Sequence, residues 1–317
     1  MKAGLIVNPR SGSASGKGLA LAERLKSRPH VHVRIIERFE ALPQMIAAMA
    51  NEGVTDLFIS SGDGTIQAIQ TELAERSPFA TLPRLCLLPH GTTNMTAADL
   101  GFRNKSLDAQ AALILNPQPA DVQARSTLRI ANPADNRVRH GMFLGTGAIR
   151  AATEYCQTEF NARGIKGNWP VFRTLAGALA RTLFSRPDPS DETRFDRPFA
   201  MSIHADGREV ANGTQLLMLA TTLEKLVLGA RPFRERGEGA IRSMVLPYPL
   251  PNLLRWTLPL LYGSGSGALP AGAVSTRGQS FHVETAAGYV LDGEFFEGPT
   301  GEPLRIETGP LFSYVRR

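Results

Sequence analysis

The first part of the chain alternates short apolar runs with stretches of helical spacing. Between the runs, apolar residues recur every three or four positions, as they do over Leu42–Ala50, and this spacing predicts helices. Strands that alternate with helices are typical of a parallel sheet covered by helices. A further helix is expected over Asp99–Asn116. The runs of strand length are Gly4–Val7, Val31–Ile36, Leu57–Ile59 and Leu85–Leu88.

Beyond Pro117–Pro119 the pattern changes to many short strand-like runs without helices between them. Such runs are typical of an antiparallel sandwich, and Ala205-Asp206-Gly207 predicts a hairpin turn between two of them. A helical insertion is expected at about Ala151–Ser185. The sequence therefore predicts an α/β domain with a parallel sheet and helices over residues 1–122, and a C-terminal antiparallel β-sandwich domain over residues 123–317. Whether the final strands pack back on the first domain is left open.

Three of the predicted strands end in loops rich in glycine and small polar residues. These loops are Asn8–Gly18, Ser60–Thr65 and His90–Asn94. In an open parallel sheet, loops at the carboxyl ends of the strands lie together where ligands bind. Glycine lets the backbone approach a bulky anion, and the N–H groups at a helix start suit phosphate. Asp63 fits such a site if a divalent cation lies between it and the phosphates. An ordinary Asp-Gly turn is the alternative.

Composition narrows the classes of protein that fit. A hydrophobic content of 43% with 20% charged residues indicates a folded chain. The formal net charge is +6 and the pI is near 9.6, which suits anionic partners without choosing among them. No nucleic-acid reader motif is present, so no nucleic-acid partner is expected. Two distant cysteines, no signal-peptide core and no long apolar run favour a cytoplasmic protein, with peripheral contact at the inner face of the membrane left open.

Four short motifs occur in a fixed order along the chain. They are Asn8-Pro9-x-Ser11-Gly12, Ser61-Gly62-Asp63-Gly64-Thr65, Pro89-x-Gly91-Thr92-x-Asn94 and Asp292-Gly293-Glu294. Together they resemble the signature set of the diacylglycerol kinase catalytic family, which includes sphingosine and ceramide kinases and soluble bacterial lipid kinases. The resemblance spans nearly the whole chain. It implies a nucleotide-binding first domain, a second domain that binds a lipid substrate, and ATP with Mg²⁺ as cofactors.

The resemblance also implies a division of work among the motif residues in phosphoryl transfer. Asp63 is expected to organise Mg²⁺ on the phosphates. Glu294 is expected to accept the proton of the lipid hydroxyl, with Asp292 orienting it or the metal, and the reverse assignment stays open. The residues expected to bind the nucleotide are Asn8, Ser11, Gly12, Gly62, Gly64, Thr65, Gly91, Thr92 and Asn94.

The chain departs from the family pattern at three places. Ser61 stands where glycine is usual, as in the sphingosine kinase branch, and Met95 follows Asn94 where an acidic residue or threonine is common. The family's second-domain magnesium loop corresponds here to residues 238–242, in which Glu238 is the expected metal ligand and Arg242 replaces the last carboxylate.

The resulting prediction is an ATP-dependent lipid kinase that phosphorylates the primary hydroxyl of a diacylglycerol-like, ceramide or sphingoid lipid at a membrane surface. The alternatives are a soluble-substrate kinase related to NAD kinase and phosphofructokinase, and a catalytically silent nucleotide- or lipid-binding regulator. Two apolar stretches, Trp169–Arg186 and Leu253–Tyr262, form either core or a lipid-entry lip that rests on anionic headgroups. The sequence leaves open which lipid is used and the oligomeric state, with a homodimer among the options.

Overall fold

The protein is described by a computed structural model that covers residues 2–12, 15–76, 78–104, 106–116, 121–154, 197–234, 237–263 and 267–316. The chain divides into two compact units. Unit one comprises Met1–Thr127 and Pro310–Arg317, and unit two comprises Leu128–Gly309. Most of the expected helical insertion, including all of Trp169–Arg186, lies outside the described residues.

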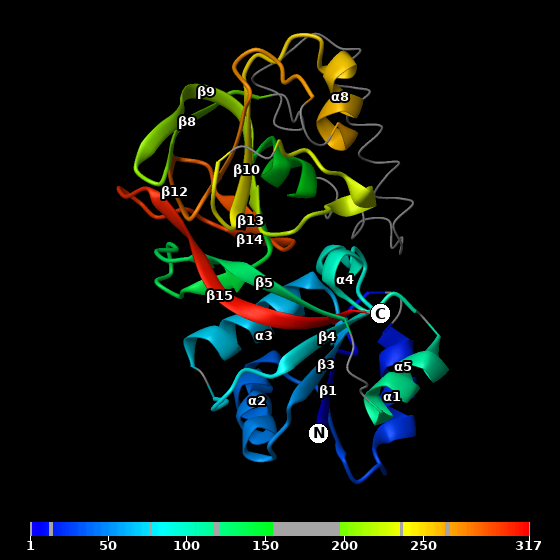
Figure 1. The fold of residues 1–317 in the computed structure, drawn as a ribbon. Coiled ribbons are helices and arrows are strands. Elements are labelled where there is room, and N and C mark those ends of the chain that lie inside the picture. Colours follow the sequence, from blue (N-terminus) through cyan, green and yellow to red (C-terminus); the bar gives the residue numbers. More distant parts are fainter. Residues whose placement is uncertain are drawn as a thin grey trace. The chain divides into compact units, whose positions relative to one another are not determined.

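Unit one alternates strands and helices as the apolar pattern predicts (Figure 1). Its elements are β1 (Ala3–Val7), α1 (Ser15–Leu25), β2 (Val31–Ile35), the 3-10 turn η1 (Phe39–Ala41), α2 (Leu42–Asn51), β3 (Asp56–Ser61), α3 (Asp63–Glu75), β4 (Arg84–Pro89), α4 (Met95–Leu100), α5 (Leu107–Leu115) and the first part of β5 (Asp121–Ile130), whose last three residues belong to unit two. Strands β2, β1, β3 and β4 are parallel neighbours in that order. The last strand, β15 (Leu304–Arg316), joins this sheet beside β4, where Tyr314 pairs with Leu85.

The two faces of this sheet bury different sets of side chains because successive residues of a strand point to opposite sides. Leu5 of β1, Phe58 of β3 and Cys86 of β4 belong to one buried cluster with apolar residues of α1 and α5. Gly4 faces the other way, and a Cβ on it would lie 2.9 Å from the Sδ of Met49 in α2. Helices therefore cover both faces, and the predicted α/β class is confirmed.

The prediction of a single helix over Asp99–Asn116 is wrong, because the chain forms two helices there, α4 and α5, with a break between them. Gly101 ends α4, and a Cβ there would lie 2.6 Å from the carbonyl oxygens of both Ala97 and Leu87. Phe102 then donates its N–H to that same Leu87 oxygen at 2.9 Å. The break is thus fixed by packing against β4, which the helical spacing of the sequence does not encode.

Unit two is antiparallel and rich in strands, as predicted (Figure 1). Its elements are β6 (Arg139–Gly141), β7 (Phe143–Gly147), β8 (Phe199–Ala205), β9 (Arg208–Thr221), the 3-10 turn η2 (Val227–Gly229), β10 (Ile241–Pro247), α8 (Leu253–Tyr262), β11 (Val274–Gly278), β12 (Ser280–Thr285), β13 (Tyr289–Leu291) and β14 (Glu294–Phe296). Residues 148–154 are also helical. In the described part of the chain, no helix has the length and apolar composition needed to cross a bilayer.

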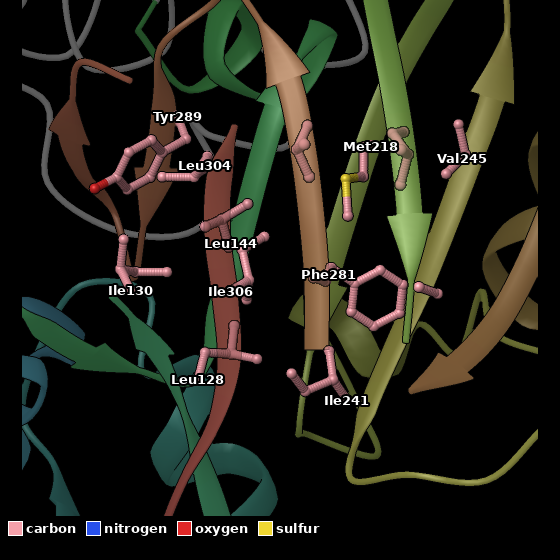
Figure 2. Close-up of a cluster of buried hydrophobic side chains, with 14 of the residues drawn as sticks. Leu128, Ile130, Leu144, Met218, Ile241, Val245, Phe281, Tyr289, Leu304 and Ile306 are labelled. Atoms are coloured by element: carbon pink, nitrogen blue, oxygen red, sulfur yellow. The ribbon is translucent and has the colours of Figure 1, made fainter. Parts of the chain in front are cut away.

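The core of unit two lies between strands that curve around it. The long strand β9 pairs with β8 along its first half and with both β7 and β10 along its second half. Figure 2 shows Leu144, Met218, Val245 and Phe281, from four different strands, directed into one apolar cluster. Each of these side chains is at most 1% exposed. Because side chains from several strands are buried in one shared cluster, the short apolar runs of this half form a single unit.

The predicted hairpin at Asp206-Gly207 is confirmed. Asp206 and Gly207 have φ of 48° and 78°, and they connect the paired residues Ala205 of β8 and Arg208 of β9. Positive φ at both central positions is the geometry that suits the twist of the flanking strands. The Asp206 carboxylate accepts the N–H of Ser280 at 2.8 Å, which links the turn to β12.

The return of β15 to unit one can be tested through one buried hydrogen bond. Gln70 of α3 donates its side-chain N–H to the hydroxyl of Tyr314 at 2.8 Å, and both residues are fully buried. Tyr314→Phe removes the acceptor and leaves that donor unpaired, so we expect a loss of about 1–3 kcal/mol in the free energy of unfolding by urea. Tyr262→Phe, at a half-exposed tyrosine, is the matched control and is expected to change stability little. Equal effects of the two substitutions would contradict this role of Tyr314.

Candidate phosphate site and candidate catalytic hairpin

The loops that follow β1, β3 and β4 meet at the carboxyl edge of the parallel sheet. A Cβ built on Gly91 would lie 2.3 Å from the Cα of Gly62. Gly12 has a φ of +62°, and a Cβ on it would lie 2.8 Å from the carbonyl carbon of Gly91. Real Cβ atoms do not approach other atoms so closely, so these positions require glycine. The three glycines bring three loops into direct backbone contact.

Asn8 connects the first loop to the start of α3. Its side-chain N–H donates to the hydroxyl of Thr65 at 2.8 Å, and its side-chain oxygen accepts the backbone N–H of Arg10 at 2.9 Å. Its backbone oxygen accepts the hydroxyl of Ser11 at 3.0 Å. The predicted nucleotide residues Asn8, Ser11 and Thr65 therefore lie together, and Asn8 fixes the conformation of its own loop.

Asn94 shapes the third loop in a similar way. It adopts a left-handed conformation with φ of 51°, which asparagine tolerates better than most residues. Its side-chain oxygen accepts the N–H of Gly91 at 2.7 Å, and its side-chain N–H donates to the Gly91 oxygen at 2.6 Å. Thr92, between them, is exposed, and Gly64 lies in the first turn of α3. The next residue, Thr93, is also exposed, so the hydroxyls of Thr92 and Thr93 are both open to a ligand.

Asp63 is buried at the first position of α3, where its carboxylate bridges to the next helix. One carboxylate oxygen accepts the N–H of Met95 at 3.0 Å and the other accepts the N–H of Thr96 at 2.9 Å. Burial raises the pKa of the Asp63 carboxyl above its ordinary value of 3.8, and these two backbone N–H groups oppose that rise. Sequence reasoning assigned Asp63 to a metal and missed this second use, because the sequence does not reveal which distant backbone groups a carboxylate reaches.

His90 lies beneath the same loops. It is 2% exposed, and its Nδ1 lies 2.8 Å from the hydroxyl of Ser60, which joins the ends of β3 and β4. Burial, and to a lesser degree the charge of Lys17, lowers the pKa of His90 from 6.5 to about 4, although the side chain of Gln110, as an acceptor for the ring, opposes this. The imidazole is therefore neutral near pH 7.

In unit two, the motif Asp292-Gly293-Glu294 forms a tight hairpin. Asp292 and Gly293 have φ of 49° and 91°, and they connect Leu291 of β13 to its partner Glu294 of β14. Both central residues have the positive φ of a two-residue hairpin turn. The sequence predicted catalytic roles for Asp292 and Glu294, and the structure shows that a tight turn holds these two residues. The strand β14 itself was not anticipated.

The two carboxylates of this hairpin have different surroundings. Asp292 is 5% exposed, and its two oxygens accept the N–H groups of Met142 at 2.8 Å and Phe143 at 2.9 Å. A Cβ on the facing Gly141 would lie 2.6 Å from an Asp292 oxygen, so this contact also requires glycine. Glu294 is exposed. Asp292 is therefore held inside the unit, and Glu294 is the carboxylate that a substrate can reach.

Charged and aromatic side chains hold the hairpin from outside. The guanidinium of Arg139 lies 4.3 Å from the ring centre of Phe296, and Phe296 stacks on Tyr289 at 5.5 Å. Asp135 accepts a hydrogen bond from Arg139 at 2.7 Å, and this bond lowers the pKa of Asp135 to about 2. Cation–π and ion-pair contacts of this kind restrict the motion of the strand that begins at Glu294.

The predicted second-domain metal ligand, Glu238, is exposed. Glu238 lies between Gly237 and Gly239 in the bend before β10, and Gly239 packs against the backbone of Gly278. Among the described residues, no group of three or more His, Cys, Asp and Glu side chains is arranged to hold a metal ion. The metal roles of Asp63 and Glu238 therefore stay predictions, and the two residues belong to different units.

Comparisons with known proteins agree with the motifs. Residues 2–125 match the diacylglycerol kinase catalytic domain. The crystal structure of a diacylglycerol kinase from Bacillus anthracis str. Sterne is similar to this chain with a TM-score of 0.65 and 18% identity, over 100% of this chain and 97% of the other. A second structure from the same organism has a TM-score of 0.67 with the same identity and coverage. The resemblance to the diacylglycerol kinase catalytic family is thus confirmed, and the fold extends over both units.

The crystal structure of yeast NADH kinase complexed with NADH has a TM-score of 0.48 and 10% identity, over 99% of this chain and 81% of that one, a similarity from which nothing is concluded. No curated protein matches the chain.

The burial of His90 predicts a pH dependence of stability. Its pKa is about 4 in the folded protein and near 6.5 when the chain unfolds, so between these values the unfolded chain binds more protons. The free energy of unfolding should therefore rise by about 3 kcal/mol from pH 4 to pH 6.5 on account of this residue. Urea unfolding of His90→Gln across that range should lack this part of the slope, and identical slopes for the two proteins would exclude it.

Proposed function

We propose that this chain, with its diacylglycerol kinase catalytic domain in residues 2–125, transfers the γ-phosphoryl group of ATP to the primary hydroxyl of a diacylglycerol-like or ceramide-like lipid. Unit one binds the nucleotide, and unit two presents the lipid and the base. The observation that carries the proposal is the backbone contact among Gly12, Gly62 and Gly91, which lets three loops approach one anion without side chains in the way.

The nucleotide contacts come from the three loops. Backbone N–H groups at Gly62, Gly64 and Gly12 are suited to phosphate oxygens, because they lie at or near the starts of helices. Thr92 offers an exposed hydroxyl in the third loop. Ser11 offers a second hydroxyl, one residue before the Gly12 that packs against Thr92. Asn8, Thr65, Gly91 and Asn94 keep these loops in place through the hydrogen bonds and contacts described above.

Asp63 fits the divalent cation that ATP carries. It is the only acidic residue in the three loops, it lies at the start of α3 beside the glycine turn, and a carboxylate is a ligand that Mg²⁺ prefers. When bound, Mg²⁺ supplies charge neutralisation at the phosphates. The part of Asp63 is to hold that ion, directly or through water, at a position that the N–H groups of Met95 and Thr96 fix.

Glu294 accepts the proton of the lipid hydroxyl. As the hydroxyl oxygen forms its bond to the γ-phosphorus, the bond from that phosphorus to the β–γ bridging oxygen breaks and ADP leaves. The proton passes to the Glu294 carboxylate, which is exposed at the start of β14. Asp292 positions the turn through its hydrogen bonds to Met142 and Phe143, and Glu294 acts as the base because Asp292 is buried whereas Glu294 is exposed.

The lipid acceptor is a diacylglycerol, a ceramide or a sphingoid base, without an order among them. Ser61, the residue that resembles the sphingosine kinase branch, is fully buried at the end of β3. A buried hydroxyl does not contact a substrate, so Ser61 does not select the lipid. The enzyme works in the cytoplasm, in peripheral contact with the membrane that holds its substrate.

The phosphate site can be tested by adding a methyl group to one loop. Gly91→Ala places a Cβ against Gly62 and separates the loops, so we expect ATP to bind at least roughly tenfold more weakly by calorimetry. Gly16→Ala is the matched control, because a Cβ at Gly16 meets nothing within 4 Å. Circular dichroism confirms that both variants are folded. Unchanged affinity in folded Gly91→Ala would contradict the site.

The base can be tested by an isosteric change. Glu294→Gln should lower kcat for label transfer from ATP to lipid by roughly 10²–10⁴ while ATP affinity and the melting temperature stay unchanged, because the side chain is exposed. Glu284→Gln, an exposed glutamate on β12, is the control and should keep full activity. Asp292→Asn should instead lower the melting temperature, because its amide N–H₂ would face a backbone N–H. Loss of activity in stable Asp292→Asn, with full activity in Glu294→Gln, would reverse the two roles.

A further inference from the structure

Helix α8 has an inner face and an outer face. Leu260 is 7% exposed and, with Trp256, packs into a buried cluster that includes Phe233 and Met244. On the outer face, Leu258 is 68% exposed, and Leu261 and Tyr262 are exposed as well. These three residues follow a spacing of three and four, so they lie side by side on one surface of the helix. Apolar side chains thus face outward along a helix that is already anchored on its other side.

A second exposed apolar segment lies beside the end of α8. The N–H of Arg231 donates to the oxygen of Leu261 at 2.6 Å, and the buried guanidinium of Arg234 donates to the oxygen of Pro259 at 3.1 Å. Just before these residues, the short turn η2 exposes Val227 and Leu228, and Leu228 is 63% exposed. Leu228 also has a φ of 58°, a left-handed conformation that is uncommon for leucine.

We call the exposed side chains of the two segments the apolar ridge, which consists of Val227, Leu228, Leu258, Leu261 and Tyr262. Eleven large hydrophobic side chains are exposed among the described residues, and five of them belong to this ridge. Such a concentration on two neighbouring segments marks an interaction surface, whereas single exposed residues need no explanation.

Cationic residues accompany the ridge. Arg255 is exposed one turn before Leu258 on the same face of α8, Arg231 is exposed beside Leu261, and Lys225 is half-buried just before η2. Glu224 is the only acidic residue in residues 224–231 and 252–263. Apolar side chains next to an excess of positive charge match the boundary between the acyl chains and the headgroups of an anionic bilayer.

We infer that the apolar ridge docks the protein on the surface of an anionic bilayer, with its leucines in the headgroup–acyl boundary and its cations against the lipid phosphates. This inference rests on the proposed function, because a kinase of a membrane lipid must reach the bilayer that holds its acceptor. A second copy of the chain is the less suitable occupant, since a symmetric contact would bring the same cations against each other. Tyr262 suits the bilayer, because its ring is apolar and its hydroxyl is polar.

The docking surface is tested by flotation of the full chain with two kinds of vesicle, phosphatidylcholine alone and phosphatidylcholine with an equal part of phosphatidylglycerol. The wild type should bind the mixed vesicles, and binding should fall as salt is raised. Leu228→Glu and Leu258→Glu should each weaken binding roughly tenfold or more. Leu311→Glu is the matched control, because Leu311 is 62% exposed on β15 and its replacement adds the same negative charge outside the ridge. Wild-type-like binding by both ridge variants would overturn the inference.

Two further measurements separate this inference from the proposed function. With a short-chain diacylglycerol that is monomeric in solution, Leu258→Glu should turn over at the wild-type rate, while its rate on the same headgroup in mixed vesicles should fall. A wild type that phosphorylates no lipid yet binds vesicles through the ridge would refute the kinase proposal and keep the docking surface. A ridge-dependent dimer in sedimentation, with no vesicle binding, would show that the occupant is a second copy and would refute the docking surface.

Discussion

The structure depends on two buried carboxylates that each hold two successive backbone N–H groups. Asp63 accepts from residues 95–96, and Asp292 accepts from residues 142–143. A carboxylate without partners in such a place would be destabilising by several kcal/mol, so each chain segment is held where its partner requires. In each case the acid lies at a turn next to a glycine, and it fixes a neighbouring segment far away in sequence. The positions that we propose to bind phosphate or to accept a proton are thereby set by carboxylates that we assign to neither role.

This arrangement separates support from chemistry at both sites. At the phosphate site, Asn8 and Asn94 use their amides to shape the loops, while glycine backbones and the exposed Thr92 remain open to a ligand. At the hairpin, Asp292 is buried, and Glu294, two residues later, is exposed. A rigid support matters because phosphoryl transfer depends mainly on positioning and on neutralising charge. Both sites therefore combine a fixed frame with a small number of free groups.

The sequence predicted the parts of this structure that local patterns encode. The apolar runs located β1 and β4, and the glycine loops and the hairpin turn at Asp206-Gly207 followed from residue type. What it did not predict depends on tertiary contacts. The helix break at Gly101 results from packing against Leu87. Asp292 is held by backbone groups about 150 residues away in sequence, and the proposed assignment of the base to Glu294 depends on this burial of Asp292.

The central claim is that the phosphate acceptor is a membrane lipid, and one assay tests it most directly. Wild-type protein is incubated with ATP labelled in its γ-phosphate and, separately, with diacylglycerol, ceramide, sphingosine, phosphatidylglycerol or NAD. The account predicts that the label enters the organic extract with at least one lipid that has a primary hydroxyl, and that NAD remains unlabelled. Label on NAD alone, or on no acceptor while ATP still binds, would contradict it.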